Sequence, residues 1–126
     1  MTTSIEAITT AAVSRALDAA TLRHQAIAAN IANHAVEGYV PTKVTFAAEF
    51  AQLRAGQTAT GLDAQTVSAM KPQLVQSFDA QGRPAAVRLD SEMAEMAQNA
   101  VHYQALTRGL SRHLAILSTA ASDGKK

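Results

Sequence analysis

The chain has 126 residues, no cysteine and a formal net charge of +1. This length suits one domain, and a near-neutral charge with scattered Arg and Lys gives no basic surface for nucleic acid. The lack of cysteine excludes disulfides, thiolate metal sites and a cysteine nucleophile. No apolar run approaches the roughly 20 residues of a membrane-spanning helix, and the start MTTSIEAITT lacks the pattern of a secretory signal.

An apolar seam organises the N-terminal part of the chain. Spacings of four and three alternate through the series Val13, Leu17, Ala20, His24, Ile27 and Ile31. This spacing places the series on one stripe of an α-helix. No Gly or Pro interrupts Ser4 to Asn33, so we expect a single long helix, with Asn33 in a left-handed conformation near its end and Gly38 preventing continuation. His24 lies on the seam, where we expect a packed, hydrogen-bonded side chain rather than a ligand or a pH sensor.

A second seam of the same period lies at the other end of the chain. Its series is Leu89, Met93, Met96, Ala100, Tyr103, Thr107, Leu110, Leu114 and Leu117. Asp90 is placed to cap this helix, which runs to Ser122. The two seams predict an all-α dominated fold in which residues 1–39 and 89–126 pair as an antiparallel coiled coil.

The middle segment, residues 40–88, is predicted to be small and irregular. Phe46, Phe50 and Leu53 share one face of a short helix, and Gln57 to Lys71 resembles a flexible loop. Beyond it, two apolar stretches flank a turn-rich sequence and predict a β-hairpin: Leu74 to Phe78 and Ala85 to Leu89.

The expected core is thin. The apolar fraction is 48%, but only 4% of residues are aromatic and the helices are rich in Ala. A buried Leu or Ile contributes about 1.5–3 kcal/mol and an Ala methyl much less. We therefore expect neighbouring subunits to complete the burial of the helices.

No constellation in the sequence predicts catalysis. Glu92 and Glu95 lie three residues apart, but no nucleophile, phosphate loop or base accompanies them, and a solvated first helical turn explains both. His102 and His113 lie about 16 Å apart along a helix, which is too far for one metal ion. We therefore expect no enzyme activity, no cofactor, no metal site and no small-molecule substrate.

Short motifs resemble the conserved ends of bacterial flagellar axial proteins. In that family an ANIAN-type helix end leads to a Gly-Tyr loop, as in Ala28 to Asn33 followed by Gly38-Tyr39 here. Glu92-Met93 followed by Tyr103 to Leu106 resembles the other conserved end of the family, and Leu22 to Ile27 before the motif is similar to its rod proteins. The family usually has Thr-Pro before Gly-Tyr, whereas this chain has Val36-Glu37. The motif residues are Ala29, Asn30, Ile31, Ala32, Asn33, Gly38 and Tyr39.

The resemblance implies a structural subunit of the proximal rod in the flagellar basal body. Its partners would be further copies of itself, other rod proteins, and the membrane-ring protein and rod adaptor at the base. It would reach the periplasm through the flagellar type III export gate without a cleaved signal peptide. The terminal helices would then carry the assembly seam: Val13, Leu17, Ile27, Ile31, Met93, Met96, Tyr103, Leu110, Leu114 and Leu117.

Some interpretations stay open at this stage. Asn30 and Asn33 either bind a neighbouring subunit or satisfy backbone groups at their own helix end. Phe46 and Phe50 resemble an element suggested to contact the export gate, although packing against the terminal helices explains the same pair. A soluble coiled-coil chaperone or adaptor of a secretion system would share the seams and the lack of catalytic residues.

Overall fold

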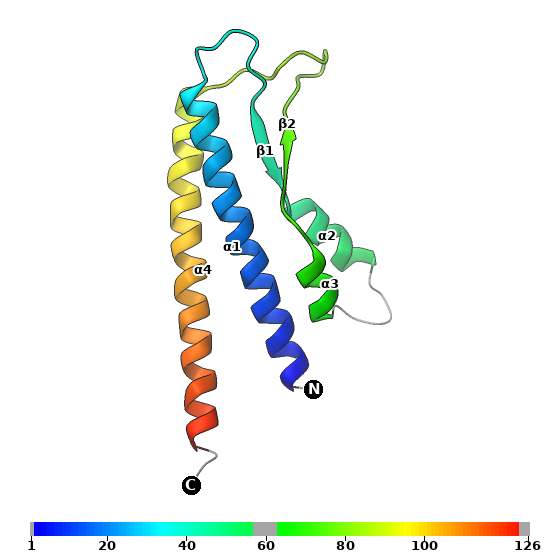
Figure 1. Ribbon diagram of the computed structural model, residues 1–126, viewed down its shortest axis with the longest axis vertical. Coiled ribbons are helices and arrows are strands. Elements are labelled where there is room, and N and C mark those ends of the chain that lie inside the picture. Colours follow the sequence, from blue (N-terminus) through cyan, green and yellow to red (C-terminus); the bar gives the residue numbers. More distant parts are fainter. Residues whose placement is uncertain (1, 57–62, 124–126) are drawn as a thin grey trace.

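The computed structural model describes residues 2–56 and 63–123, with the side chains of residues 2–4, 53, 54 and 56 outside the description. The fold is dominated by helix (Figure 1). In chain order the elements are α1 (Thr2–Ala32), β1 (Thr42–Thr45), α2 (Ala47–Gly56), α3 (Ala64–Ala69), β2 (Gln73–Gln76) and α4 (Leu89–Asp123).

The long helices α1 and α4 pack side by side, and the two chain ends lie toward the same end of the molecule (Figure 1). Both helices are continuous and begin and end within two residues of the predicted positions. Asp90 lies inside the first turn of α4 instead of capping it, and its carboxylate pairs with Arg88 at 3.1 Å. Among the described residues, no helix is long and apolar enough to cross a membrane.

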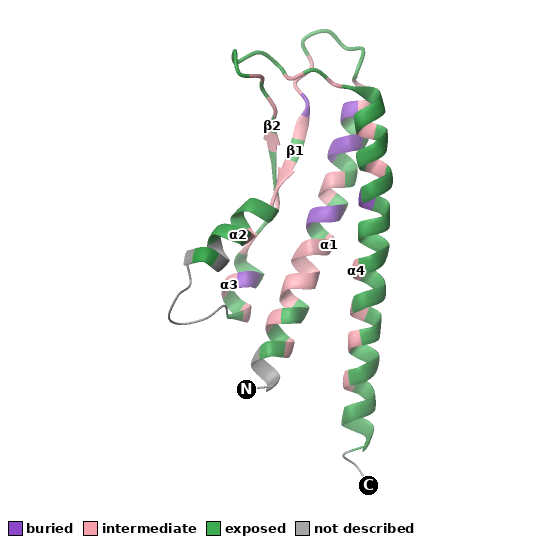
Figure 2. Cartoon of the chain, turned by 180° about the vertical axis from the view of Figure 1, so that it is seen from behind, coloured by how far each residue is buried: buried purple, intermediate pink, exposed green. Residues whose placement is uncertain are grey.

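The core lies along α1, which packs against α4, both strands and α3 (Figure 2). The buried apolar residues are Ala19, Ala20, Ala26 and Ile27 of α1, Val67 of α3, and Pro41 just before β1. Half of these residues are alanines, so little apolar area is removed from water. This agrees with the thin core expected from composition.

The predicted hairpin between Leu74–Phe78 and Ala85–Leu89 forms only beside its turn, and the ladder predicted along its two strands is wrong. β2 pairs antiparallel with β1, from Thr42 opposite Gln76 to Thr45 opposite Gln73. The predicted partners meet at a bridge between Phe78 and Pro84, where the Ala85 N–H donates to the Ser77 carbonyl at 3.0 Å and the Asp79 N–H to the Arg83 carbonyl at 2.8 Å. Beyond this bridge the chain leaves for α4, so β1 supplies the ladder instead.

Helix α3 lies inside the stretch predicted to be a flexible loop, Gln57 to Lys71, so that prediction is wrong for residues 64–69. Asp63 caps the helix, since its carboxylate accepts from the Thr66 N–H at 2.6 Å. Hydrogen bonding from Thr66 lowers the pKa of Asp63. Val67 is fully buried and anchors the short helix. Residues 57–62 of the predicted loop lie outside the described residues.

The end of α1 differs from the prediction in one detail. Asn33 does not adopt a left-handed conformation; among the described residues, positive φ angles occur at Gly38 and Gly82. The Asn33 N–H still donates to the Ala29 carbonyl at 3.0 Å. The reversal of the chain is therefore made at Gly38, where φ is 76°.

Candidate assembly site

Asn30 is the most connected polar residue at the end of α1. It is 3% exposed. Its Oδ1 accepts from the Tyr39 hydroxyl and the Thr42 N–H, both at 3.0 Å. Its Nδ2 donates to the Thr42 carbonyl at 2.9 Å and to Glu92 Oε2 at 3.2 Å. All four hydrogen-bonding positions of the carboxamide are therefore used within the chain.

The carboxamide of Asn30 imitates a neighbouring strand. It binds both the N–H and the carbonyl of Thr42, as the peptide group of a paired strand does in an antiparallel ladder. This closes the edge of β1 at that residue and fixes the strand to α1. The bond to Glu92 adds the first turn of α4, so a single side chain joins three elements.

Gly38 and Tyr39 complete this arrangement. The positive φ of Gly38 turns the chain back toward α1, and no other atom lies within 4 Å of an added Cβ. Glycine is therefore required here for its backbone conformation and not for space. The turn returns the Tyr39 hydroxyl to Asn30. The Gly-Tyr pair and the ANIAN-type helix end are thus parts of one hydrogen-bonded unit.

The other motif residues face outward to different degrees. Ala29 and Ala32 are exposed, whereas Ile31 and Asn33 are half-buried. The Asn33 amide donates to the carbonyl of Ala29 on its own helix at 2.8 Å. Asn30 therefore ties elements together, while Asn33 finishes the helix.

The face of α4 that packs on α1 is rotated from the expected seam. Its residues are buried or half-buried: Met96, Asn99, Leu106, Leu110, His113 and Leu117. Asn99 and Leu106 precede the expected Ala100 and Thr107 by one position, which is a turn of about 100° around a helix. Met96, Leu110 and Leu117 belong to both series. The polar Asn99 interrupts the apolar pattern of the contact face. The neighbouring stripe, which Ala100 and Thr107 continue, therefore fitted the expected spacing better.

Asn99 is the site residue that sequence reasoning missed. It is 4% exposed, and its Nδ2 donates to the Ala20 carbonyl of α1 at 2.8 Å. Arg23 donates to its Oδ1 at 3.4 Å. The spacing Met96, Asn99, Leu106 and Leu110 could have identified it as a polar residue inside an apolar stripe. A buried amide between helices fixes their register because other registers leave it unpaired.

The rotation leaves a second apolar stripe of α4 uncovered within the chain. Met93 is 60% exposed, Tyr103 44% and Leu114 50%. On α1, by contrast, Ile27 is buried and Val13, Leu17 and Ile31 are half-buried. The expected seam residues are thus divided between an internal contact and an outward-facing surface. We call the outward-facing set Met93, Tyr103 and Leu114 the α4 outer stripe.

The histidines and acidic residues form no reactive group. His24 is exposed, so the expectation of a packed side chain is wrong; the helical period carries it past the edge of the contact face. His102 and Glu95 are also exposed. In the part of the chain that the structure describes, no cluster of His, Asp or Glu has the arrangement of a metal site.

Phe46 and Phe50 stack with ring centroids 6.1 Å apart at the start of α2. They line an apolar cleft of about 390 Å³ together with Val13 and Ala16 of α1 and Leu106 of α4. Both rings are half-buried. Packing against the terminal helices, one of the two interpretations of this aromatic pair, is therefore consistent with its position.

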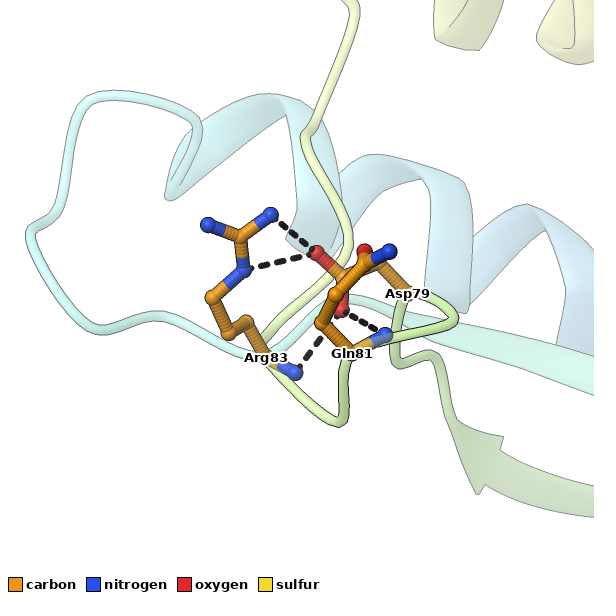
Figure 3. Close-up of polar contacts among 3 residues, drawn as sticks. All are labelled: Asp79, Gln81 and Arg83. Carbon is orange, nitrogen blue, oxygen red and sulfur yellow. Dashed lines mark hydrogen bonds and ion pairs between the residues drawn. The ribbon is translucent and has the colours of Figure 1, made fainter.

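A rigid turn follows β2. The Asp79 carboxylate accepts from the N–H groups of Gln81 and Arg83 and from the Arg83 side chain, with each of these hydrogen bonds 2.9 Å long (Figure 3). Hydrogen bonding from the Arg83 backbone is the main cause that lowers the pKa of Asp79. Gly82, with a φ of 75°, lets the chain reverse between Asp79 and Arg83.

No protein-family model and no curated protein matches the chain. The fold itself defines the class: a helix-dominated chain whose long terminal helices pack together, with a small two-stranded middle segment beside them.

Proposed function

We propose that the chain is a structural subunit of the proximal rod of the bacterial flagellar basal body, of the FlgB type. The observation that carries the proposal is the hydrogen-bonded unit of Asn30, Tyr39, Thr42 and Glu92. Three of these four residues belong to the motifs that resemble flagellar axial proteins. Their convergence gives the motif a physical purpose, which is to set the angle at which the chain leaves the helix.

The terminal helices are proposed to form an antiparallel coiled coil. Asn30 binds Glu92, and the carbonyl of Ala20 binds Asn99. Moving ten positions back along α1 therefore moves the contact seven positions forward along α4. Contacts that run in opposite sequence directions along two helices are the pattern of antiparallel packing.

The α4 outer stripe supports assembly. Three large apolar or aromatic residues spaced along one exposed helix are poorly solvated and gain stability when a neighbouring subunit covers them. In the proposed rod, helices of successive subunits pack on this stripe and on the small Ala side chains of α1. Torque would then be transmitted by close packing over many copies, with no chemical step.

The proposed place and route follow from the same assignment. The subunit would lie in the periplasmic rod beside the ring protein and the rod adaptor, after passing the type III export gate. The cleft at Phe46 and Phe50 remains a proposed contact with that gate. Both rings are half-buried, so they can pack on the long helices and still present surface to the gate.

The test is peptide mass spectrometry of purified hook and basal-body complexes from the source cells. Detection of the chain in a constant ratio to ring and hook proteins is the expected result. A soluble coiled-coil chaperone or adaptor would be present in the cells but missing from intact complexes, and it would form no tubes. Absence from intact complexes would therefore overturn the rod assignment and favour that alternative.

A further inference from the structure

The two outer edges of the β1–β2 sheet differ in whether their main-chain groups form hydrogen bonds. On β1, both main-chain groups of Thr42 bind the carboxamide of Asn30 and so point away from β2. The opposing residue is Gln76, and this pair is therefore a non-hydrogen-bonded pair of the antiparallel ladder. Pairs alternate along such a ladder, so Lys43 opposite Val75 is the next hydrogen-bonded pair.

This alternation directs the main-chain groups of Leu74 and Gln76 away from β1. Among the described residues, no other backbone or side chain forms a hydrogen bond with these groups. β2 lies on the side of β1 that faces away from α1 in both views (Figures 1 and 2). Leu74 and Gln76 are also exposed, so the edge is open to another chain.

Natural sheets protect open edges with charged residues, proline or bulges. The strand Gln73–Gln76 itself contains none of these, although it is only four residues long and Lys71 and Pro72 directly precede it. A two-stranded ribbon is also marginal by itself and gains from a third strand. The edge of β2 therefore has the chemistry of a strand acceptor.

We propose that the open edge of β2 pairs with β2 of a second copy of this chain, antiparallel about a two-fold axis at Val75. Leu74 of each copy then lies opposite Gln76 of the other, and these two pairs form four main-chain hydrogen bonds. Val75 lies opposite Val75 of the second copy.

The composition of the edge favours a second copy as the occupant. The strand Gln73–Gln76 carries no charged side chain, so two copies of it bring no like charges opposite each other. Continued outward, the same register places Lys71 opposite Asp79 of the second copy. The carboxylate of Asp79 already pairs with Arg83 of its own chain at 2.9 Å, so the preference for a second copy rests on the uncharged strand.

A two-fold contact of this kind closes on itself, because each copy uses the same edge. It adds no further subunits and does not extend a helical rod. The dimer is therefore a property of the free chain, and it stands or falls independently of the proposed function.

Engineered cysteines test the register directly, because the native chain has none. Val75→Cys places the two thiols opposite each other in a non-hydrogen-bonded pair, where cross-strand Cβ atoms are close enough for a disulfide. Under mild oxidation at about 0.1–1 mM chain, a range suited to a small interface, we expect most of this variant to cross-link. The matched control is Gln73→Cys, which faces Ser77 of the second copy and should stay largely uncross-linked. Equal cross-linking of the two variants would overturn the proposal.

Leu74→Pro provides the second test. It removes an N–H that faces the second copy and leaves the bonds between β1 and β2 intact. Two hydrogen bonds are lost per dimer, and we expect dimerisation measured by sedimentation to weaken about tenfold or more. Circular dichroism verifies that the helices persist. A dimer of undiminished affinity in this variant, or a native chain that stays at 13.2 kDa up to about 1 mM, would overturn the proposal.

Discussion

The hydroxyl of Tyr39 donates to Oδ1 of Asn30 at 3.0 Å, which closes the loop after α1 onto the helix that precedes it. The same carboxamide holds β1 and the first turn of α4. The relative placement of the long helices and the middle segment thus depends on one side chain.

Asn30→Ala should destabilise the chain by about 2–4 kcal/mol, because it removes four hydrogen bonds and leaves partners in a buried site without replacements. Urea unfolding followed by circular dichroism measures the change. Asn33→Ala is the matched control, since the half-buried side chain of Asn33 makes one bond, within its own helix, and its loss should cost within about 0.5 kcal/mol. Equal losses in the two variants would contradict the special role of Asn30.

Substitutions on the two faces of the terminal helices should separate folding from assembly. Ile27→Asp puts a charge at a position that is 3% exposed and should cost more than about 3 kcal/mol of stability. Leu114→Asp lies on the α4 outer stripe, where the residue is 50% exposed, and should leave the urea midpoint nearly unchanged.

If the chain has the proposed role in the rod, both variants should abolish swimming when they replace the native chain, the first through unfolding and the second through loss of contact with neighbours. Motility in soft agar and detection of the chain in purified basal bodies measure this. Normal swimming with Leu114→Asp would show that the α4 outer stripe is not an assembly surface.

The long helices could be predicted from the sequence because thirty residues without Gly or Pro and a regular apolar period admit few alternatives. Their contact face could not be predicted, because α4 carries two adjacent apolar stripes that share Met96, Leu110 and Leu117. The choice between them depends on Asn99 reaching the Ala20 carbonyl, which is a tertiary contact.

The strand pairing of the middle segment was also hard to predict, because it too depends on a tertiary contact. Leu74 to Phe78 has a strand pattern, but its partner is chosen by Asn30 fixing β1 nearby, and no local turn sequence indicates this. In the site, the motif residues Asn30 and Tyr39 could be selected by resemblance. Their mutual hydrogen bond could not be foreseen, since it requires the turn at Gly38.

Gly38→Ala and Gly109→Ala should have opposite effects. Space is open around both positions, so neither variant creates a clash. Gly38 has a positive φ, and alanine there should cost about 1–2 kcal/mol. Gly109 lies inside α4, where alanine should stabilise the chain by about 0.5–1 kcal/mol. Thermal unfolding of the two variants beside the native chain gives both signs, and a lower melting temperature for Gly109→Ala would contradict this account.

The turn at Asp79 should loosen in acid. The pKa of Asp79 is lowered in the folded chain, mainly by hydrogen bonding from the Arg83 backbone, so its contribution is present above the ordinary value of 3.8 and is lost as pH falls through the lower folded value. We expect the amide protons of Gln81 and Arg83 to shift and exchange faster below about pH 4. NMR titration measures this. Asp79→Asn should remove the titration, and an unchanged acid response in that variant would assign it to another group.

The terminal helices of the free chain should exchange amide protons quickly. Few side chains on α1 are buried, most of them alanine, so this burial only narrowly offsets the entropy lost in fixing two long helices. Hydrogen exchange at micromolar concentration should therefore give weak protection across both helices, fastest toward the chain ends, far from the Asn30 anchor. In the proposed rod the same amides should slow by at least about tenfold as neighbours cover α4. Slow exchange throughout Ala16 to Asn33 in the free chain would rule out ordering on assembly, because the helices would then be stable without neighbours.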